Sequence, residues 1–247
     1  MSALGEKVVW ITGAGSGIGR AVARMFAAEG ASLVLIGRRA RMLRNVYDEV
    51  CASGGRGEVL ALDVCRREQV EAAASGLIER HRRVDVLVNN AGLNVRGRKL
   101  GTLTGEDWDQ VMQTNLTGAF NMIHAALPAM RKQQDGLIIN VSSMSAKRVS
   151  GVAGTAYTAS KHGMNGLSLS VSAEEGRNGI RCTALMPGAV NTDMLEKQTI
   201  VYSAEERARM IQPEDLAQAV RFLALLPGRS TVPEMHVVPT LSRAPGA

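Results

Sequence analysis

The sequence predicts a doubly wound α/β fold, a parallel sheet with helices on both faces. Short runs rich in Val, Ile and Leu alternate with longer segments of helical apolar spacing along the whole chain. A glycine-rich turn at residues 12–19 follows the first of these runs. Strands that alternate with helices form parallel sheets with right-handed crossovers. No repeat, linker or low-complexity stretch interrupts this order, so we expect a single domain spanning residues 1–247.

The elements follow from these patterns and from the residues that stop them. The first helix ends at Gly30, and Ser53-Gly54-Gly55 breaks the second. We expect strands at residues 7–11, 31–36, 58–62, 84–88, 137–141, 180–185 and 234–238. We expect helices at residues 20–29, 40–52, 66–80, 105–130, 157–177 and 213–225.

Composition excludes several classes of protein. The chain is 45% hydrophobic and 21% charged, as is usual for a globular protein, and no apolar run approaches the ~20 residues of a membrane span. The net charge of +6 is spread over separate clusters without a nucleic-acid recognition motif, so we expect no nucleic-acid partner. The three cysteines lack ligand-like spacing and the histidines are isolated, so we expect no metal. Free thiols and the lack of a signal-peptide pattern predict a cytoplasmic location.

The glycine-rich turn is typical of a pyrophosphate site. Glycines let the backbone approach a ligand closely, and the N-terminus of the following helix offers N–H groups to an anion. The frame that fits is Thr-Gly-x-x-x-Gly-x-Gly, formed by Thr12, Gly13, Gly17 and Gly19. The alternative is a glycine-rich connection between a strand and a helix that binds nothing.

The end of the second strand favours NADP over NAD. An NAD-preferring dinucleotide fold places an acidic residue here to hold the ribose 2′-hydroxyl. This sequence has Gly37, followed by Arg38 and Arg39, and a guanidinium suits a 2′-phosphate in charge and geometry. The alternative is that the two arginines only cap the end of the strand.

Tyr157 and Lys161 are the candidate catalytic pair. They lie one turn apart on a predicted helix and face the same way. A nearby ammonium favours the phenolate and lowers the pKa of a phenol, so Tyr, Lys and a Ser hydroxyl together can hold a carbonyl oxygen and give it a proton. The spacing alone also fits an ordinary pair of surface residues.

Taken together, the motifs resemble those of the short-chain dehydrogenase/reductase family, from residue 7 to about residue 192. The matching motifs are Thr12-Gly13-x-x-x-Gly17-x-Gly19, Asp63, Asn89-Asn90-Ala91-Gly92, Asn115, Asn140-x-Ser142-Ser143, Tyr157-x-x-x-Lys161 and Pro187-Gly188 with Thr192. They occur in the order and approximate spacing of that family.

The resemblance implies a role for each matching residue. Tyr157 would be the general acid or base, Lys161 would lower its pKa and bind the nicotinamide ribose, and Ser143 would hold the substrate oxygen. Ser142 and Ser145 are alternatives to Ser143, because Ser143 stands slightly farther from Tyr157 than is common. Asn115 would distort its helix and support a proton-relay water. The expected cofactor contacts are Gly13, Ser16, Gly17, Ile18, Gly19, Arg38, Arg39, Asp63, Val64, Asn89, Ala91, Gly92, Tyr157, Lys161, Pro187, Gly188, Val190 and Thr192.

Two function classes follow. The first is an NADP-dependent oxidoreductase that interconverts a secondary alcohol or hydroxy acid and a ketone, and the second is an NADP-binding sensor or scaffold without chemistry. The intact Tyr157 and Lys161 favour the enzyme. A segment near residues 191–212 would form part of the wall around a small carbonyl or alcohol substrate. The resemblance also implies a homodimer or homotetramer.

Overall fold

The computed structural model describes residues 4–149, 151–197 and 201–240. Within them, seven parallel strands form one sheet in the order β3-β2-β1-β4-β5-β6-β7. The strands are β1 (Val8–Thr12), β2 (Ser32–Gly37), β3 (Arg56–Ala61), β4 (Val86–Asn89), β5 (Gly136–Val141), β6 (Ile180–Pro187) and β7 (Glu234–Val237). The predicted doubly wound fold is confirmed, and each predicted strand is present within a few residues of its expected bounds.

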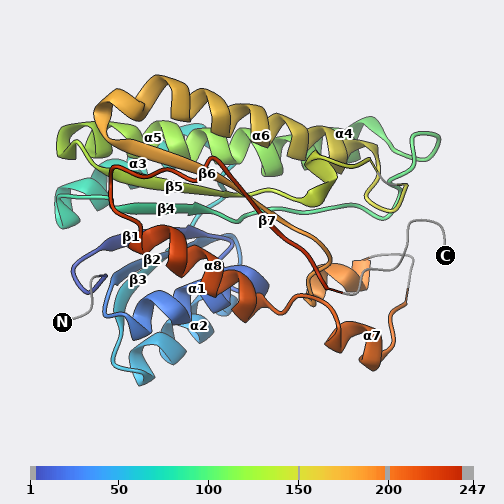
Figure 1. Ribbon diagram of the computed structural model, residues 1–247, viewed down its shortest axis with the longest axis horizontal. Helices are drawn as coiled ribbons and strands as arrows, with labels where there is room; N and C mark the ends of the chain where they lie inside the picture. Colours follow the sequence, from blue (N-terminus) through green and yellow to red (C-terminus); the bar gives the residue numbers. More distant parts are fainter. Residues whose placement is uncertain (1–3, 150, 198–200, 241–247) are drawn as a thin grey trace.

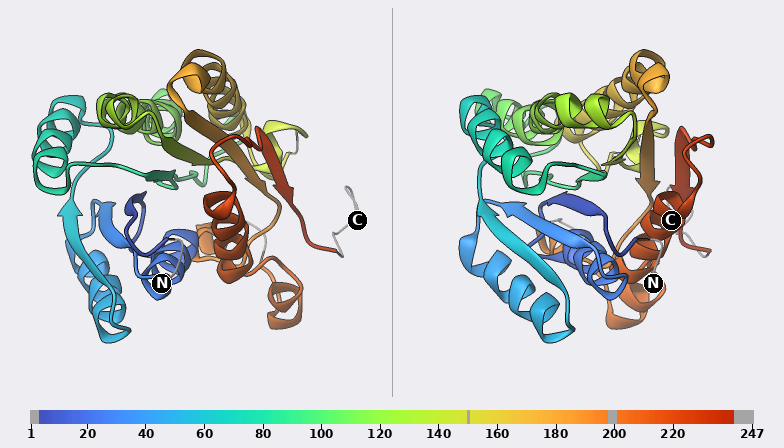
Figure 2. Two further views of the ribbon diagram at one scale, coloured as in Figure 1. Left: turned by 60° about the vertical axis from the view of Figure 1, so that its left-hand side comes forward. Right: turned by 90° about the vertical axis from the view of Figure 1, so that its left-hand side faces the viewer.

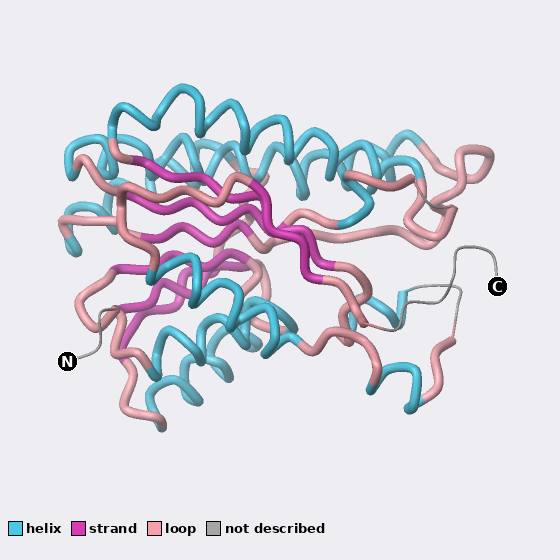
Figure 3. The backbone as a smooth tube through the Cα atoms, viewed as in Figure 1, coloured by secondary structure: helices cyan, strands magenta, loops and turns pink. Residues whose placement is uncertain are grey.

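Helices cover both faces of the sheet (Figures 1 and 3). One face carries α1 (Gly17–Ala28), α2 (Ala40–Ala52) and α8 (Pro213–Leu225). The other carries α3 (Arg67–His81), α4 (Gly105–Met112), α5 (Gly118–Gln133) and α6 (Thr155–Glu175). The short α7 (Ala204–Ala208) lies apart from both layers, near the carboxyl ends of the strands. Figure 2 shows the twist of the sheet between these layers.

Alternating side chains of the strands build two apolar cores, because successive residues of a strand point to opposite faces. In β1, Val9 and Ile11 pack under α1 and α8, whereas Val8 and Trp10 pack under α3 and α5. Aromatic residues are scarce, so these cores consist mainly of Ala, Val, Leu, Ile and Met, with the fully buried Trp10 and Phe26 as exceptions.

The predicted helix at residues 105–130 is divided in the structure. The chain runs as α4, then as a π-helical turn η1 (Gln113–Thr117), and then as α5. Asn115 lies within η1 and is fully buried, so the distortion expected at this residue is confirmed. Apolar periodicity did not predict the break, because a wide turn inserts a residue without changing the apolar character of the sequence.

The order of the strands reverses between β1 and β4. In a doubly wound sheet, ligands bind outside the carboxyl ends of the strands at such a point. The turn after β1 and the segment after β4 meet there. The Thr12 hydroxyl accepts hydrogen bonds from the backbone N–H groups of Asn90 and Ala91, both at 2.9 Å. The Asn90 amide donates in return to the carbonyl oxygens of Thr12 and Gly13, at 3.1 and 3.2 Å.

Candidate active site

The turn between β1 and α1 is shaped by close backbone approach. Gly13 and Gly17 have φ angles of +64° and +51°, which side chains rarely adopt. A Cβ at Gly19 would lie 2.3 Å from the Gly13 carbonyl oxygen and 2.7 Å from the Asn90 amide nitrogen. Ser16 precedes α1 without making a side-chain cap to it, so the N–H groups of the first helical turn face the site. The turn therefore presents backbone donors with no side chain between them and a ligand.

A cavity of about 140 Å³, here called the arginine cavity, lies beside this turn. Its lining residues are Gly13, Gly15, Gly37, Arg38, Arg39, Leu43, Leu62, Asp63, Val64, Ala91, Gly92 and Thr114. Arg38 and Arg39 are exposed on its rim, and the Arg39 guanidinium donates to the Ser16 hydroxyl at 3.1 Å. The arginine cavity thus brings together the arginines and the Asp63-Val64 pair that the sequence predicts for one cofactor.

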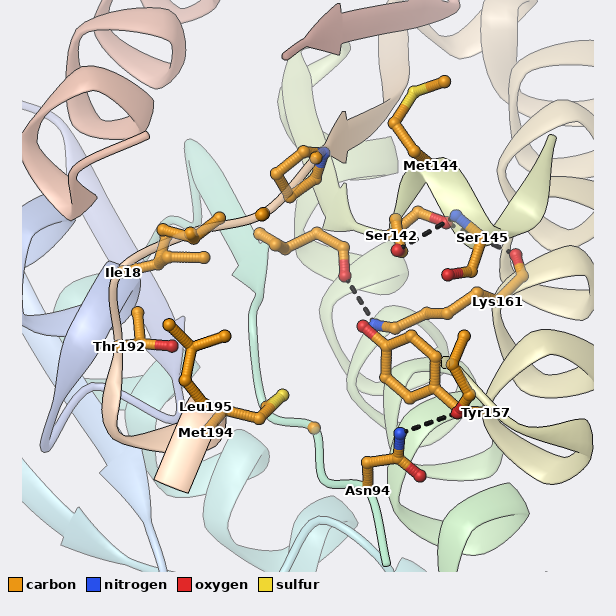
Figure 4. A pocket seen from close by; sticks show the side chains of 18 of the residues that line it. Ile18, Asn94, Ser142, Met144, Ser145, Tyr157, Lys161, Thr192, Met194 and Leu195 are labelled. Carbon is orange, nitrogen blue, oxygen red and sulfur yellow. Dashed lines mark hydrogen bonds between the residues drawn. The ribbon is translucent and has the colours of Figure 1, made fainter. Parts of the chain in front are cut away.

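A second cavity of about 320 Å³, the tyrosine cavity, contains the candidate catalytic pair. Its predicted lining residues are Ile18, Gly92, Ser142, Ser143, Ser145, Tyr157, Lys161, Pro187, Gly188, Val190 and Thr192. Gly92 lines both cavities, so the two adjoin. Figure 4 shows Tyr157 and Lys161 alongside each other, with Ile18, Thr192, Met194 and Leu195 across the cavity from them.

Lys161 is a buried ammonium next to the phenol of Tyr157. Its Nζ lies 5.6 Å from the centroid of the Tyr157 ring and donates to the Val141 carbonyl at 2.7 Å. Only 4% of Lys161 is exposed, and burial lowers its pKa to about 8. Burial raises the pKa of Tyr157, and a hydrogen bond with Ser143 partly offsets this rise. Desolvation of the phenol therefore outweighs any lowering by Lys161 in the protein alone.

The serines of the Asn140-x-Ser142-Ser143 motif point in different directions. The Ser142 hydroxyl donates to the Asn165 side-chain oxygen at 2.7 Å and is buried against α6. The Ser143 hydroxyl bonds to Tyr157 and accepts from the Ser145 backbone N–H at 3.1 Å. Ser143 is thus the serine that bonds to the phenol, whereas Ser142 ties β5 to α6.

Asn115 holds the loop after β4. Its side-chain oxygen accepts from the Leu93 N–H at 2.8 Å, and its amide donates to the Leu93 carbonyl at 3.0 Å and to the Ser160 hydroxyl at 3.1 Å. A Cβ at Gly92 would lie 3.4 Å from the Asn115 side-chain oxygen and 3.8 Å from the Lys161 Nζ. The π-helical turn therefore places Asn115 beside Lys161, from a distant part of the sequence.

Comparison with known proteins agrees with this geometry. Residues 7–201 match the family of short chain dehydrogenases. The chain is 37% identical to the 3-oxoacyl-[acyl-carrier-protein] reductase of Thermotoga maritima over 229 residues, which cover 88% of this chain and 90% of that protein. The chain belongs to the short-chain dehydrogenase family.

Solved structures of short-chain dehydrogenases superpose on nearly the whole chain. A metagenomic short-chain oxidoreductase in complex with NADP is 36% identical with a TM-score of 0.85, covering 98% of this chain and 100% of that one. A short chain dehydrogenase from Mycobacterium paratuberculosis bound to NAD is 27% identical, also with a TM-score of 0.85, covering 96% of this chain and 98% of that one. Members of this fold thus bind either nicotinamide dinucleotide.

The residues of this short-chain dehydrogenase fit a dinucleotide. The close packing of Gly19 against Gly13 holds the turn in shape, and the uncapped start of α1 and the adjoining arginines form a donor set for phosphate groups. Asn89 differs from its neighbours, because its side chain points into the core and donates to the Asn140 side-chain oxygen at 2.9 Å. Its predicted cofactor contact therefore has no side-chain counterpart in either cavity.

Several wall residues lie outside the sequence motifs. Asn94, Arg98, Leu195 and Tyr202 line the tyrosine cavity, the last two from the predicted substrate segment, and so does Asn90, which stands in the Asn89-Asn90-Ala91-Gly92 motif without a predicted role of its own. The signal was their place in loops that follow recognised motifs, but nothing local indicates which of them point inward. Residues 198–200 of the substrate segment lie outside the described residues.

The described residues also bear on metal binding and membrane insertion. Among residues 4–149, 151–197 and 201–240, no cluster of His, Cys, Asp and Glu has the form of a metal site. None of the helices in this part of the chain has the length and apolar character needed to cross a membrane.

Proposed function

We propose that this short-chain dehydrogenase is an NADP(H)-dependent oxidoreductase that interconverts a secondary alcohol, or a hydroxy acid, and a ketone. The observation that carries the proposal is the convergence of Ser143, Tyr157 and Lys161 in one cavity that adjoins the glycine turn. The name of the Thermotoga relative, a 3-oxoacyl-[acyl-carrier-protein] reductase, supports a ketone as the oxidised substrate.

Each polar group has a distinct task at the substrate oxygen. NADP(H), when bound, supplies or accepts the hydride. In reduction, the Tyr157 hydroxyl donates a proton to the carbonyl oxygen while the Ser143 hydroxyl holds that oxygen in place. The buried Lys161 ammonium stabilises the phenolate that remains. In oxidation the same phenolate accepts the proton of the alcohol.

The raised pKa of Tyr157 predicts opposite pH dependence for the two directions. At neutral pH the phenol is protonated, which suits its role as the acid in reduction. Oxidation needs the phenolate, so its rate should rise as the pH increases above neutrality. A rate of alcohol oxidation that falls over this range would contradict the role of Tyr157 as the base.

NADP is the proposed cofactor because of the chemistry at the end of β2. Gly37 offers no carboxylate to a ribose 2′-hydroxyl, and Arg38 and Arg39 follow it at the rim of the arginine cavity. The metagenomic neighbour in complex with NADP supports this choice, and the mycobacterial neighbour bound to NAD keeps NAD as the competing outcome.

The experiment that tests the function is oxidation of NADPH and of NADH, followed by absorbance, against ketones, aldehydes, quinones and keto acids. We expect turnover with NADPH on at least one carbonyl class. Tyr157→Phe should lower kcat by about 10²- to 10⁴-fold, the usual contribution of a positioned proton donor, with NADPH affinity retained. Tight NADPH binding without turnover on any class would favour a sensor or scaffold, and full turnover by Tyr157→Phe would refute the proposed proton donor.

We also propose a substrate segment and an oligomeric state. The substrate segment near residues 191–212 contributes Thr192, Met194, Leu195 and Tyr202 to the wall of the tyrosine cavity.

Exposed apolar side chains on the outer helices, Phe120, Leu169 and Phe222, support a homodimer or homotetramer, which light scattering would test. The three cysteines are free, in keeping with the predicted cytoplasmic location.

A further inference from the structure

The helix that carries Tyr157 begins without a side-chain cap. Its N-cap residue is Gly154, and its first residue is Thr155. The first N–H groups of a helix have no partner within the helix and need acceptors from elsewhere. The Thr155 N–H finds one in the backbone carbonyl of Arg98, at 3.1 Å. The backbone carbonyl of Arg98, in the loop after β4, therefore caps the N-terminus of α6.

The side chain of Arg98 joins the same two loops. It is only 7% exposed, and its Nε donates to the Val95 carbonyl at 3.0 Å while its Nη1 donates to the Val152 carbonyl at 3.1 Å. The planar fork of a guanidinium suits two acceptors in fixed directions. The Asn94 amide adds a parallel link to the Ala153 carbonyl at 2.9 Å.

Gly154 allows this close approach. Its φ is +83°, and a Cβ at this position would lie 2.5 Å from the Arg98 Cβ and 2.6 Å from the Arg98 carbonyl oxygen. The two loops thus touch backbone to backbone. The contact ends at Thr155, two residues before Tyr157, so the position of the loop decides where the first turn of α6 begins.

The charge of Arg98 also bears on the tyrosine cavity. Burial lowers its pKa, and a cation beside a helix N-terminus is disfavoured by the helix dipole. A neutral side chain would fill this space at lower cost in desolvation. Arg98 and Lys161 both line the cavity, whose described lining includes no Asp or Glu. Burial is the largest influence on the pKa of Tyr157 and raises it, and a second cation in the same cavity acts in the opposite direction, toward the phenolate.

We propose that Arg98 is a positioning residue for Tyr157: by fastening residues 152–155 to the loop after β4, it holds the first turn of α6 so that the phenol faces Ser143. The inference rests on the proposed function, because the placement of the phenol matters only if Tyr157 transfers a proton. Misplacement of a reacting group by about 1 Å can cost about 10²-fold in rate. Arg98 itself takes no part in the proton transfer.

The test compares Arg98→Met, Arg98→Lys and the control Arg96→Met, which removes an exposed charge from the same loop. We expect Arg98→Met to lower kcat by about 10- to 100-fold with NADPH affinity within about 2-fold of the wild type. The pH at which alcohol oxidation reaches half of its maximum should rise, because a cation has left the cavity. Arg98→Lys should restore the pH profile more fully than kcat, because it keeps the charge and loses the fork.

Hydrogen exchange of residues 152–160 supplies a readout independent of turnover. Arg98→Met should speed exchange at the start of α6, whereas Arg96→Met should leave it unchanged. If the wild type binds NADPH but reduces no carbonyl compound, the proposed function fails and the exchange data still test the anchoring of α6. Unchanged exchange together with unchanged kcat in Arg98→Met would overturn the inference. A variant in which kcat, NADPH affinity and melting temperature all fall would also overturn it, because that pattern indicates general destabilisation.

Discussion

The turn after β1 and the seam between β5 and α6 both shape the site, but by different means. The turn depends on the absence of side chains: glycines at residues 13, 17 and 19 allow positive φ angles or close packing against neighbouring atoms. The seam relies on buried polar side chains. Asn140 donates to the Ser168 hydroxyl at 2.9 Å, and Ser142 donates to Asn165 at 2.7 Å. A steric requirement is thus met by local sequence, and a hydrogen-bond requirement is met by residues far apart in the chain.

The largest expected effect comes from filling the turn. Gly19→Val places carbon where the Gly13 carbonyl oxygen already lies, 2.3 Å from the Cβ, so the turn must open. We expect a loss of NADPH affinity on the order of 1,000-fold, about 4 kcal/mol, measured by fluorescence titration. The control is Gly166→Ala, whose Cβ would meet nothing within 4 Å. Near-normal NADPH binding by Gly19→Val would show that the turn does not depend on a bare backbone.

The next effect concerns the buried ammonium of the seam. Burial lowers the pKa of Lys161 from its ordinary 10.5 to about 8, so between these values the unfolded chain binds a proton that the folded chain has lost. Stability from this group therefore rises with pH across that window, by on the order of 3 kcal/mol.

Urea unfolding of the wild type and of Lys161→Met, at several pH values between about 7 and 10.5, measures the contribution of Lys161 to the pH dependence of stability. Other lysines and tyrosines titrate in both proteins, so the quantity of interest is the difference between their free energies of unfolding. We expect the wild type to gain stability relative to Lys161→Met as the pH rises. Parallel curves would mean that Lys161 is solvated in the folded protein.

A smaller effect is expected at the rim of the arginine cavity, where side chains supplement the bare turn. Arg38→Asp removes a cation that suits a 2′-phosphate and adds a carboxylate that suits a ribose hydroxyl. We expect the ratio of NADPH to NADH affinity to fall by about 100-fold, about 2.7 kcal/mol. Arg41→Asp, an equal charge change on an exposed residue of α2, is the control. An equal loss for both cofactors would contradict the assignment of Arg38 to the phosphate.

The smallest effect separates the two serines of the seam. Ser142→Ala removes a buried hydrogen bond to Asn165, and we expect it to lower the free energy of unfolding by about 1 to 2 kcal/mol with little change in kcat. Ser143→Ala should do the opposite and lower kcat, because its hydroxyl bonds to Tyr157. If Ser142→Ala were the inactive variant, the role proposed for Ser143 would pass to its neighbour.

Some features of the site were readable because they depend on short stretches of chain. Tyr157 and Lys161 share a face because a helix brings residues four apart together, and the glycines of the turn stand at fixed spacing around the start of a helix. Short apolar runs predicted the strands, and their alternation with helices indicated a parallel sheet.

Other features depended on contacts that spacing does not encode. Asn89 and Asn90 are adjacent, yet one bonds to Asn140 in the core and the other to Thr12 at the site. The burial of Arg98 likewise follows from the meeting of two loops more than fifty residues apart, as the separation of 54 between Arg98 and Val152 shows. Neither the direction of the Asn89 and Asn90 side chains nor the burial of Arg98 leaves a trace in the apolar pattern of the local sequence.

By itself, then, the sequence determined the doubly wound fold, the glycine turn and the pairing of Tyr157 with Lys161, because each depends on periodicity or steric freedom within a few residues. Only the tertiary structure decided which serine meets the phenol, where the long helix opens at Asn115, and how burial shifts the pKa values of Tyr157 and Lys161. Desolvation and long-range hydrogen bonds exist only once distant segments have packed together.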